Sequence, residues 1–227
     1  MLQKAMLSKR KSKPLRVEVL ERLVKILPGR NLLELAQCYS ISISFGGKKN
    51  KGWVGQTIER AAGLNLDPSA ARDGEDFELK TTELLFRDGQ FVPKETLKIT
   101  QLNPKSVLDE EFENSVFWQK FGRLILVGYY NPAPDIYLTK KILPVDVNNP
   151  AIYREVKSFW DDVRHVVCSG EICGLNNLGS SEGYVQLRPL GNGKQTSVCP
   201  VSGRRFPARA FYATKKLIQL LINEAAL

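Results

Sequence analysis

The chain has 227 residues, of which 43% are hydrophobic, enough to bury one large core or two smaller ones. No stretch approaches the roughly 18 consecutive apolar residues of a membrane span, and the N-terminal segment MLQKAMLSKRKSKPLR lacks the apolar part of a secretory signal. We therefore expect a cytoplasmic protein without membrane contact. The 33 Lys and Arg residues against 24 Asp and Glu leave a net charge of +9, which favours a polyanionic partner.

The positive charge is concentrated in a few short segments. They lie at residues 4–16, 48–51 and 203–209, followed by Lys215 and Lys216. Such clusters are typical of a surface that binds nucleic acid. A basic surface that only keeps the protein soluble would give the same composition.

Apolar residues at helical spacing predict helices in the first part of the chain, over residues 16–27, 31–39 and 53–63. Pro28 and Gly29 end the first helix, Asn31 is a suitable N-cap for the second, and Gly63 ends the third. From residue 77 the pattern changes to the alternation that is typical of strands.

Strands are predicted over residues 77–86, 91–102 and 122–130, with a turn at Arg87-Asp88-Gly89 between the first two. Further helices are predicted around residues 109–120 and 148–167, and an amphipathic helix over 213–226 closes the chain. Strands mixed with helices in this order indicate an α/β fold with a central sheet.

The segment EDFELKT, residues 75–81, places charged side chains on a predicted strand. With a period of two residues, Asp76, Glu78 and Lys80 share one face, and Phe77 and Leu79 share the other. One interpretation is a solvated sheet edge, where alternating charge is common. The other is a metal site.

A metal site needs oxygen ligands from more than one segment, as Mg²⁺ prefers. Asp73 lies in a turn before the strand and can approach a cation from another direction than Glu78, so we favour this pair as metal ligands. Asp76 competes with Asp73 because it shares a face with Glu78. Lys80 would position or help deprotonate the attacking water and offset phosphate charge. On a helix nearby, Glu59 would present another carboxylate to the same cleft.

Two motifs in this region resemble the MutH family, which comprises the MutH mismatch-repair endonucleases and related type II restriction endonucleases. They are KGWVGxxxE at residues 51–59 and D-x4-ELKT at residues 73–81. The resemblance implies a restriction-endonuclease-like fold, with a central mixed β-sheet flanked by helices and two lobes around a DNA cleft. It also implies one domain over residues 1–227, with a catalytic lobe over about 1–130 and a DNA-recognition lobe over about 131–227.

Three further segments carry the resemblance, which covers roughly residues 15–222. FENSVFWQKFGRLILVGYY at 112–130 is similar to a helix and strand of the family, and Lys120 falls where the family has a lysine near the catalytic centre. GYVQLRPLGNGK at 183–194 resembles a strand and loop whose arginine touches DNA, which implies that role for Arg188. FPARAFYATKKL at 206–217 is similar to the family's R-G-F-Y-L-K-K.

The resemblance and the residue chemistry together give two sets of site residues. The expected catalytic residues are Glu59, Asp73, Glu78, Lys80 and Lys120, with Mg²⁺ on Asp73 and Glu78. The expected DNA-contacting residues are Lys48, Lys49, Lys51, Arg188, Arg209, Tyr212, Lys215 and Lys216. Among these we expect the lysines near the final helix to contact phosphates, Arg188 to contact guanine, and Tyr212 to sense a base edge or its methylation.

The sequence departs from the family's repair enzymes at two positions. Those enzymes place six residues between the metal-binding Asp and the Glu, which falls on Ala71 here, whereas the four-residue spacing to Asp73 resembles a subset of MutH-like restriction enzymes. Leu190 stands where the family tends to have a lysine. We therefore expect a Mg²⁺-dependent, sequence-specific double-stranded DNA endonuclease of the type II restriction class, with a GATC-like site.

Two alternatives stay open. One is a methyl-directed mismatch-repair enzyme that nicks DNA and works with a MutL-like partner. The other is a DNA-binding module that has lost catalysis. The recognition sequence, sensitivity to methylation, nicking versus double-strand cleavage and the oligomeric state do not follow from the sequence.

The remaining reactive and aromatic residues favour structural roles. A zinc site of His165, Cys168, Cys173 and Cys199 would have unusual ligand spacing, so reduced and buried thiols are the preferred interpretation. The tryptophans at 53, 118 and 160 lie in apolar helical patterns that indicate core packing.

Overall fold

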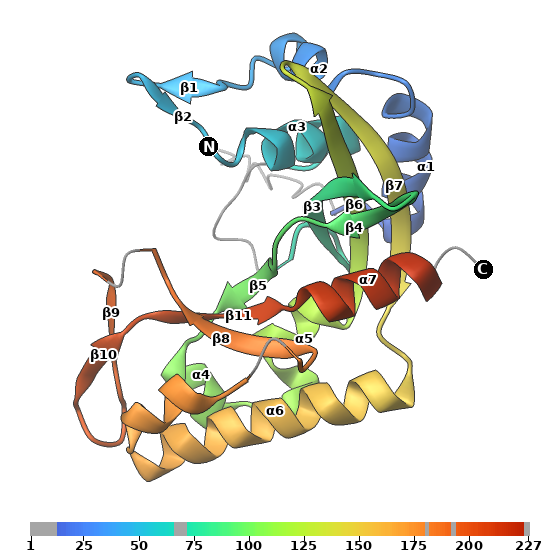
Figure 1. Cartoon of the computed structure of the whole chain (residues 1–227). Helices are drawn as coiled ribbons and strands as arrows, with labels where there is room; N and C mark the ends of the chain where they lie inside the picture. Colours follow the sequence, from blue (N-terminus) through green and yellow to red (C-terminus); the bar gives the residue numbers. More distant parts are fainter. Residues whose placement is uncertain (1–12, 66–71, 180–181, 192–193, 225–227) are drawn as a thin grey trace, which may run out of the picture.

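The computed structural model describes residues 13–65, 72–179, 182–191 and 194–224 (Figure 1). Most of the basic segment expected at 4–16, the alternative position Ala71 and the last residues of the closing helix lie outside these ranges. The described chain forms a four-stranded mixed sheet and a three-stranded antiparallel sheet with helices around them. This confirms the predicted α/β fold with a central mixed sheet.

Three helices cover one face of the four-stranded sheet, as the apolar spacing predicts. They are α1 (Arg16–Ile26), α2 (Leu32–Cys38) and α3 (Trp53–Ala62). The Asn31 side chain accepts a hydrogen bond from the Leu33 amide at 3.2 Å and caps α2. Gly63 ends α3 with φ of +75°, where a Cβ atom would meet the Arg22 guanidinium. A small hairpin of β1 (Ser44–Phe45) and β2 (Lys48–Lys49) connects α2 to α3.

The four-stranded sheet has the order β4-β3-β6-β7. Its strands are β3 (Glu78–Arg87), β4 (Gln90–Pro93), β6 (Arg123–Ala133) and β7 (Ile136–Asp146). Strand β3 runs parallel to β6, and the other two pairs are antiparallel. Strand β7 was not predicted, because Lys140 and Lys141 interrupt its apolar pattern.

The single strand predicted over 91–102 is divided between the two sheets. Strand β4 ends at Pro93, and β5 (Leu97–Gln101) enters the second sheet, whose order is β5-β11-β8. The other members are β8 (Val185–Pro189) and β11 (Arg209–Ala213), and a separate hairpin is formed by β9 (Thr196–Val198) and β10 (Arg205–Pro207). In the turn between β4 and β5, the Lys94 amide donates to the Glu83 carbonyl at 2.9 Å.

The helix predicted around 109–120 is broken into shorter pieces. They are α4 (Pro104–Asp109), a 3₁₀ turn at Phe112–Asn114 and α5 (Val116–Phe121). The Ser115 hydroxyl accepts from the Trp118 amide and starts α5 as a new helix. Helix α6 (Pro150–Ser169) matches its prediction and leads into a second 3₁₀ segment (Ile172–Asn177). Helix α7 (Lys215–Glu224) follows β11 after one residue and crosses the middle of the molecule (Figure 1).

Two hydrophobic cores lie on opposite faces of the four-stranded sheet. Leu79 and Ile125 belong to the core under α1 to α3, whereas Leu124 and Leu126 belong to the core formed with α4 to α7 and the second sheet. The tryptophans pack into these cores as expected, Trp53 in the first and Trp118 and Trp160 in the second.

The two sheets draw on interleaved parts of the chain. Residue 130 lies inside β6, so a lobe boundary there would divide a strand. Strand β5, from the first half, belongs to the second sheet, and β7, from the second half, belongs to the first. Within the described ranges, no helix combines the length and the hydrophobicity that crossing a bilayer requires.

Candidate active site

A bend before β3 places Asp73 beside the start of that strand. The Asp73 carboxylate accepts a hydrogen bond from the Leu79 amide at 2.8 Å, and the Gly74 amide donates to the Phe77 carbonyl at 3.1 Å. A Cβ atom at position 74 would lie 1.9 Å from the Phe77 ring, so the bend requires glycine there. The local sequence thus brings Asp73 close to the first residues of β3, as the turn before the strand predicts.

Glu78 is buried at the centre of this region, with only 2% of its surface exposed. One carboxylate oxygen, Oε1, accepts from Lys80 Nζ at 2.6 Å and from Lys120 Nζ at 3.2 Å. The other oxygen, Oε2, is buried and has no hydrogen-bond partner among the described residues. A solvated sheet edge is therefore excluded, and a buried oxygen without a partner suits a site that takes up a cation.

Asp76 departs from the face that strand alternation assigns to it. It lies in the bend and not in β3, which begins at Glu78. Its carboxylate accepts from the Arg16 amide at 3.2 Å and lies 2.8 Å from the Arg123 guanidinium. The two-residue period does not extend beyond the strand, so Asp76 points away from Glu78 and is engaged elsewhere.

Two carboxyl groups near Glu78 have raised pKa values. Burial, and then the negative charge of Asp73, raises the pKa of Glu59 to about 7, while Lys80 opposes the shift. Burial, and then the charge of Glu78, raises the pKa of Asp73, against the hydrogen bond from Leu79. Glu59 on α3 therefore shares one electrostatic environment with the carboxylates of the bend and of β3. A bound cation would relieve this repulsion.

The donor set fits a hard divalent cation. Asp73 and Glu78 supply carboxylate oxygens, and Glu78 Oε2 has no competing partner among the described residues. The described ranges contain no group of three or more His, Cys, Asp or Glu side chains placed to hold a metal. A cation bound by two protein carboxylates would need water or substrate oxygens to complete its shell, as Mg²⁺ commonly does.

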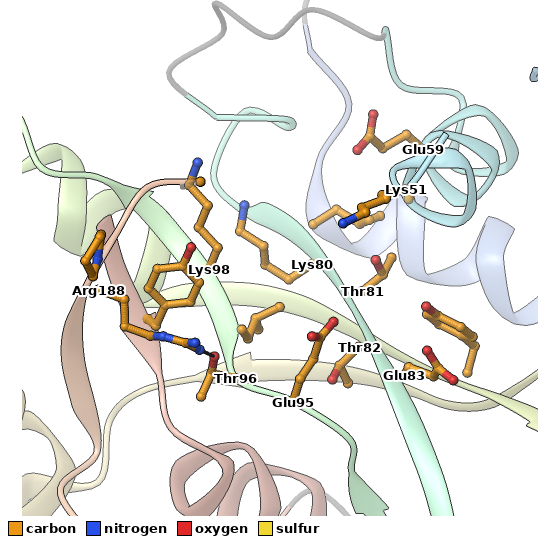
Figure 2. Close-up of a pocket in the computed structure, with 17 residues that line it drawn as sticks. Lys51, Glu59, Lys80, Thr81, Thr82, Glu83, Glu95, Thr96, Lys98 and Arg188 are labelled. Carbon is orange, nitrogen blue, oxygen red and sulfur yellow. Dashed lines mark hydrogen bonds between the residues drawn. The ribbon is translucent and has the colours of Figure 1, made fainter. Parts of the chain in front are cut away.

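A cleft of about 580 Å³ opens beside Lys80, between the two sheets (Figure 2). Residues of α3, β3, β6, β8 and β11 line it together with the start of β5 and the segment before it. Seven of its lining residues carry charged side chains: Lys51, Glu59, Lys80, Glu83, Glu95, Lys98 and Arg188. Of the catalytic candidates, Glu59 and Lys80 line this wide polar space, which can admit a charged polymer, whereas Asp73, Glu78 and Lys120 are not among its lining residues.

Arg188 and Tyr212 lie together on the wall of the cleft that the second sheet forms. The Arg188 guanidinium donates to the Thr96 hydroxyl at 2.7 Å and lies 5.4 Å from the centre of the Tyr212 ring. These contacts hold a planar cation at the cleft surface. The structure brings both residues to the same cleft as Lys80.

The other expected DNA-contacting lysines are spread over the surface. Lys51 lines the cleft beside α3, and Lys48 is exposed on β2, which also carries Lys49. Lys215 is exposed at the start of α7. Lys216 donates to the Glu182 carbonyl at 2.8 Å, over the Tyr184 ring, and does not line the cleft.

Arg209 does not present its charge on the surface, contrary to the expectation of a DNA contact. Its side chain is only 7% exposed and donates to the Asn176 side chain. Burial lowers the pKa of its guanidinium. Arg209 thus ties β11 to the segment after α6 in this structure.

The cysteines differ from the expectation in their burial. Cys199 is buried, but the other three described thiols are exposed, at Cys38, Cys168 and Cys173. All four are free.

Lys98 is a cleft residue that the sequence did not reveal. It lies on β5, lines the cleft and has a pKa that is lowered by burial and then by the charges of Lys80 and Lys120. Because residues 91–102 were interpreted as one continuous strand, no face of that segment could be matched to the site. A break after Pro93 would have been the necessary signal.

Comparisons with known proteins agree with this geometry. A family model described as DNA mismatch repair enzyme MutH matches residues 65–153, the segment that contains Asp73, Glu78, Lys80 and Lys120. The type II restriction enzyme Sau3AI of Staphylococcus aureus is 28% identical over 196 residues, 81% of this chain. The chain spans only 37% of the length of that enzyme.

Two repair proteins match over more of their own length. The DNA mismatch repair protein MutH of Pasteurella multocida (strain Pm70) is 25% identical over 179 residues, 77% of this chain and 78% of the relative. The protein of the same name from Shewanella baltica (strain OS185) is 25% identical over 221 residues, 91% of this chain and 94% of the relative.

Proposed function

We propose that the chain, which is similar to the MutH mismatch-repair proteins and to a type II restriction enzyme, cuts double-stranded DNA at a specific sequence in a Mg²⁺-dependent reaction. We place it with the type II restriction enzymes, acting on a GATC-like site. The observation that carries the proposal is the buried Glu78 carboxylate, whose Oε2 has no partner among the described residues, next to Asp73.

Asp73 and Glu78 are the residues that would hold Mg²⁺. The bound ion would lower the pKa of a water ligand and withdraw charge from the phosphate. The protein prepares this site before any ion arrives, because the Leu79 amide fixes Asp73 and two ammonium groups fix Glu78 Oε1.

The lysines and Glu59 supply the remaining chemistry. Lys80 Nζ would orient the attacking water and stabilise charge that develops on the phosphate oxygens, and Lys120 also binds Glu78 Oε1. Water attacks phosphorus, the 3′ oxygen leaves, and a 5′-phosphate remains. Glu59, with its pKa raised to about 7, can hold or release a proton at its carboxylate near neutral pH.

The cleft walls suggest how DNA is held. Arg188 has the fork geometry for a bidentate contact with guanine in the major groove, and Tyr212 lies against it to meet the neighbouring base edge. We assign phosphate contacts to Lys51, to the β2 lysines and to Lys215. Double-stranded DNA in the cytoplasm is the proposed partner.

Methyl-directed repair is the second candidate. It is favoured by the nearly full-length match to the MutH protein of Shewanella baltica, and it would add a MutL-like partner. The spacing of Asp73 and Glu78 and the absence of a lysine at Leu190 favour restriction. The complete set of Glu59, Asp73, Glu78 and Lys80 argues against a module that has lost catalysis.

Cleavage of a plasmid tests the function directly. The protein is incubated with supercoiled plasmid in Mg²⁺ and, separately, in Ca²⁺, and the ends of the products are sequenced. Discrete fragments with 5′-phosphates in Mg²⁺ alone support the restriction proposal, and nicked circles alone support the repair role. Retention of DNA on a gel without cutting in either ion would refute an endonuclease. The Glu78→Gln variant controls for contaminating nucleases.

A further inference from the structure

Lys98 stands on the same face of the second sheet as the two residues assigned to base contacts. Its backbone partner on β11 is Tyr212, and cross-strand partners share a face of the sheet. Arg188, on β8, lies against the same Tyr212 ring. Figure 2 shows Lys98 and Lys80 reaching in the same direction from β5 and β3. Lys98 therefore joins the wall of the cleft to the catalytic centre.

The charge on Lys98 is not balanced within the described protein. Lys80 and Lys120 both bind Glu78 Oε1, whereas the Lys98 ammonium group makes no hydrogen bond or ion pair with any residue in the described ranges. Burial, and then the charges of Lys80 and Lys120, lowers the pKa of Lys98. The ammonium groups of Lys80, Lys98 and Lys120 thus interact electrostatically, and an anion from outside the protein would relieve their repulsion.

The anion that suits this position is a phosphate of the DNA backbone. Lys98 is a flexible point charge with three donors, which suits phosphate better than the planar recognition of a base edge. Lys98 is also close enough to Lys80 for the two charges to interact, and in the proposed function Lys80 acts on the scissile phosphate. The planar guanidinium of Arg188 is the group that we assign to a base contact.

We propose that Lys98 binds the phosphate that adjoins the scissile phosphate on the cleaved strand and so positions that strand over Lys80. This inference rests on the proposed endonuclease function. Lys98 is a substrate-binding residue in this scheme. Its contact exists already in the bound ground state, so its loss should weaken binding of all DNA and not abolish the chemical step.

The test combines Lys98→Met with DNA that carries a single uncharged methylphosphonate. Duplexes containing the cleaved site receive the substitution in turn at the scissile phosphate and at two phosphates on either side, and binding is measured in Ca²⁺. We expect Lys98→Met to weaken binding of unmodified duplex roughly tenfold and to lower the salt slope by about 0.9. One methylphosphonate next to the scissile position should weaken the wild type but have no further effect on Lys98→Met.

Two variants control for general charge and for folding. Lys25→Met removes an equal charge from an exposed position on α1, outside the cleft, and should bind like the wild type at every phosphate. Lys98→Arg keeps the charge and should restore most of the binding. Thermal unfolding of each variant checks that the fold is intact.

Specific outcomes overturn the inference. If every methylphosphonate weakens Lys98→Met as much as the wild type, Lys98 binds no phosphate. If Lys98→Met loses discrimination between cognate and mismatched duplexes while the phosphate effects remain, Lys98 contacts a base instead. The endonuclease proposal has a separate test, because it fails only if the wild-type protein does not cut DNA in Mg²⁺.

Discussion

Two groups of charged residues meet at the bend before β3, and they differ in how completely their charges are paired. In the first group, which we call the anchoring network, Arg16 and Arg123 alternate with Asp76 and Asp146. Each of the four makes an ion pair within 3.5 Å. This network joins α1, the bend and the ends of β6 and β7, and it leaves no charge that calls for a ligand.

The second group is the catalytic cluster of Glu59, Asp73, Glu78, Lys80, Lys98 and Lys120. Within the described residues, Glu78 Oε2 has no hydrogen-bond partner and Lys98 has no acidic one. The pKa values of Glu59 and Asp73 are raised by burial first and then by the charge of a neighbouring carboxylate, Asp73 for Glu59 and Glu78 for Asp73. Paired charges hold the fold, whereas incompletely paired charges of both signs prepare a site for a cation and an anion.

Among the variants of the two groups, those that remove a catalytic carboxylate should lose the most cleavage activity. We expect Glu78→Gln and Asp73→Asn to lower the rate of plasmid cleavage in Mg²⁺ by about 10³-fold or more, because each removes a charged ligand from the proposed ion. Binding in the absence of a divalent ion should be unchanged or tighter, since a negative charge near phosphate is lost. The matched control is Asp76→Asn in the anchoring network, which should cut within a few-fold of wild type. If Asp76→Asn and Asp73→Asn lost cleavage to the same extent, the assignment of Asp73 rather than Asp76 as the metal ligand would be wrong.

Removal of Lys80 should have the next largest effect. We expect Lys80→Met to lower single-turnover cleavage by about 10²-fold to 10³-fold, because its ammonium acts on charge that develops in the transition state. Lys94→Met removes an exposed lysine that is paired with Glu83 and should leave the rate nearly unchanged. Similar rates for both variants would contradict the role of Lys80.

The pH dependence of stability should distinguish the two groups without DNA. In the folded protein the pKa of Glu59 is about 7, above its ordinary value of 4.5. The folded state therefore binds the proton more tightly, and its stability falls as pH rises from about 4.5 to about 7. In EDTA, Glu59→Gln should escape this loss and be more stable than wild type above pH 7 by about 1–2 kcal/mol after allowance for solvent screening. The melting temperatures of wild type and Glu59→Gln are compared from pH 4.5 to 7.5. If their difference stays constant, the raised pKa of Glu59, and with it the shared electrostatic environment, is refuted.

The smallest effect is expected in the anchoring network. Its side chains are partly exposed, so Asp146→Asn should lower the free energy of unfolding by about 0.5–1 kcal/mol. For a chain of this size, each kcal/mol corresponds to about 2–4 °C in melting temperature. Cleavage per folded molecule should not change. High salt should reduce the cost, because exposed ion pairs are screened. A large loss of cleavage in a folded Asp146→Asn variant would show that the two groups are coupled.

Much of the fold follows from local patterns, and the failures have physical causes. Helices α1, α3 and α6 were predicted because apolar spacing and end signals lie in the same short segment. The division of β4 from β5 was not predicted, because the turn Lys94-Glu95-Thr96 contains no glycine and is defined by pairing with distant strands.

The site shows the same limit. Strand period was sufficient to place Lys80 beside Glu78, but it misplaced Asp76, since that residue precedes the strand. Lys98 became visible only when β5 was paired with β11. The burial of Arg209 depends on Asn176, 33 positions away in the chain, which no local pattern indicates.

The length of the short turn between β4 and β5 sets the spacing between the two sheets at this point of the chain. At one end the Lys94 amide donates a hydrogen bond to the Glu83 carbonyl, and at the other the Thr96 hydroxyl accepts one from Arg188. If the turn keeps its present span, inserting one residue between these ends would shift the pairing of β5 with β11 by one residue and turn every side chain of β5 to the opposite face. Lys98 would leave the cleft and Ile99, now buried, would enter it. Many substitutions of Glu95 leave this spacing intact, so length should be more strictly constrained than composition here, and insertions should be tolerated in pairs more readily than singly.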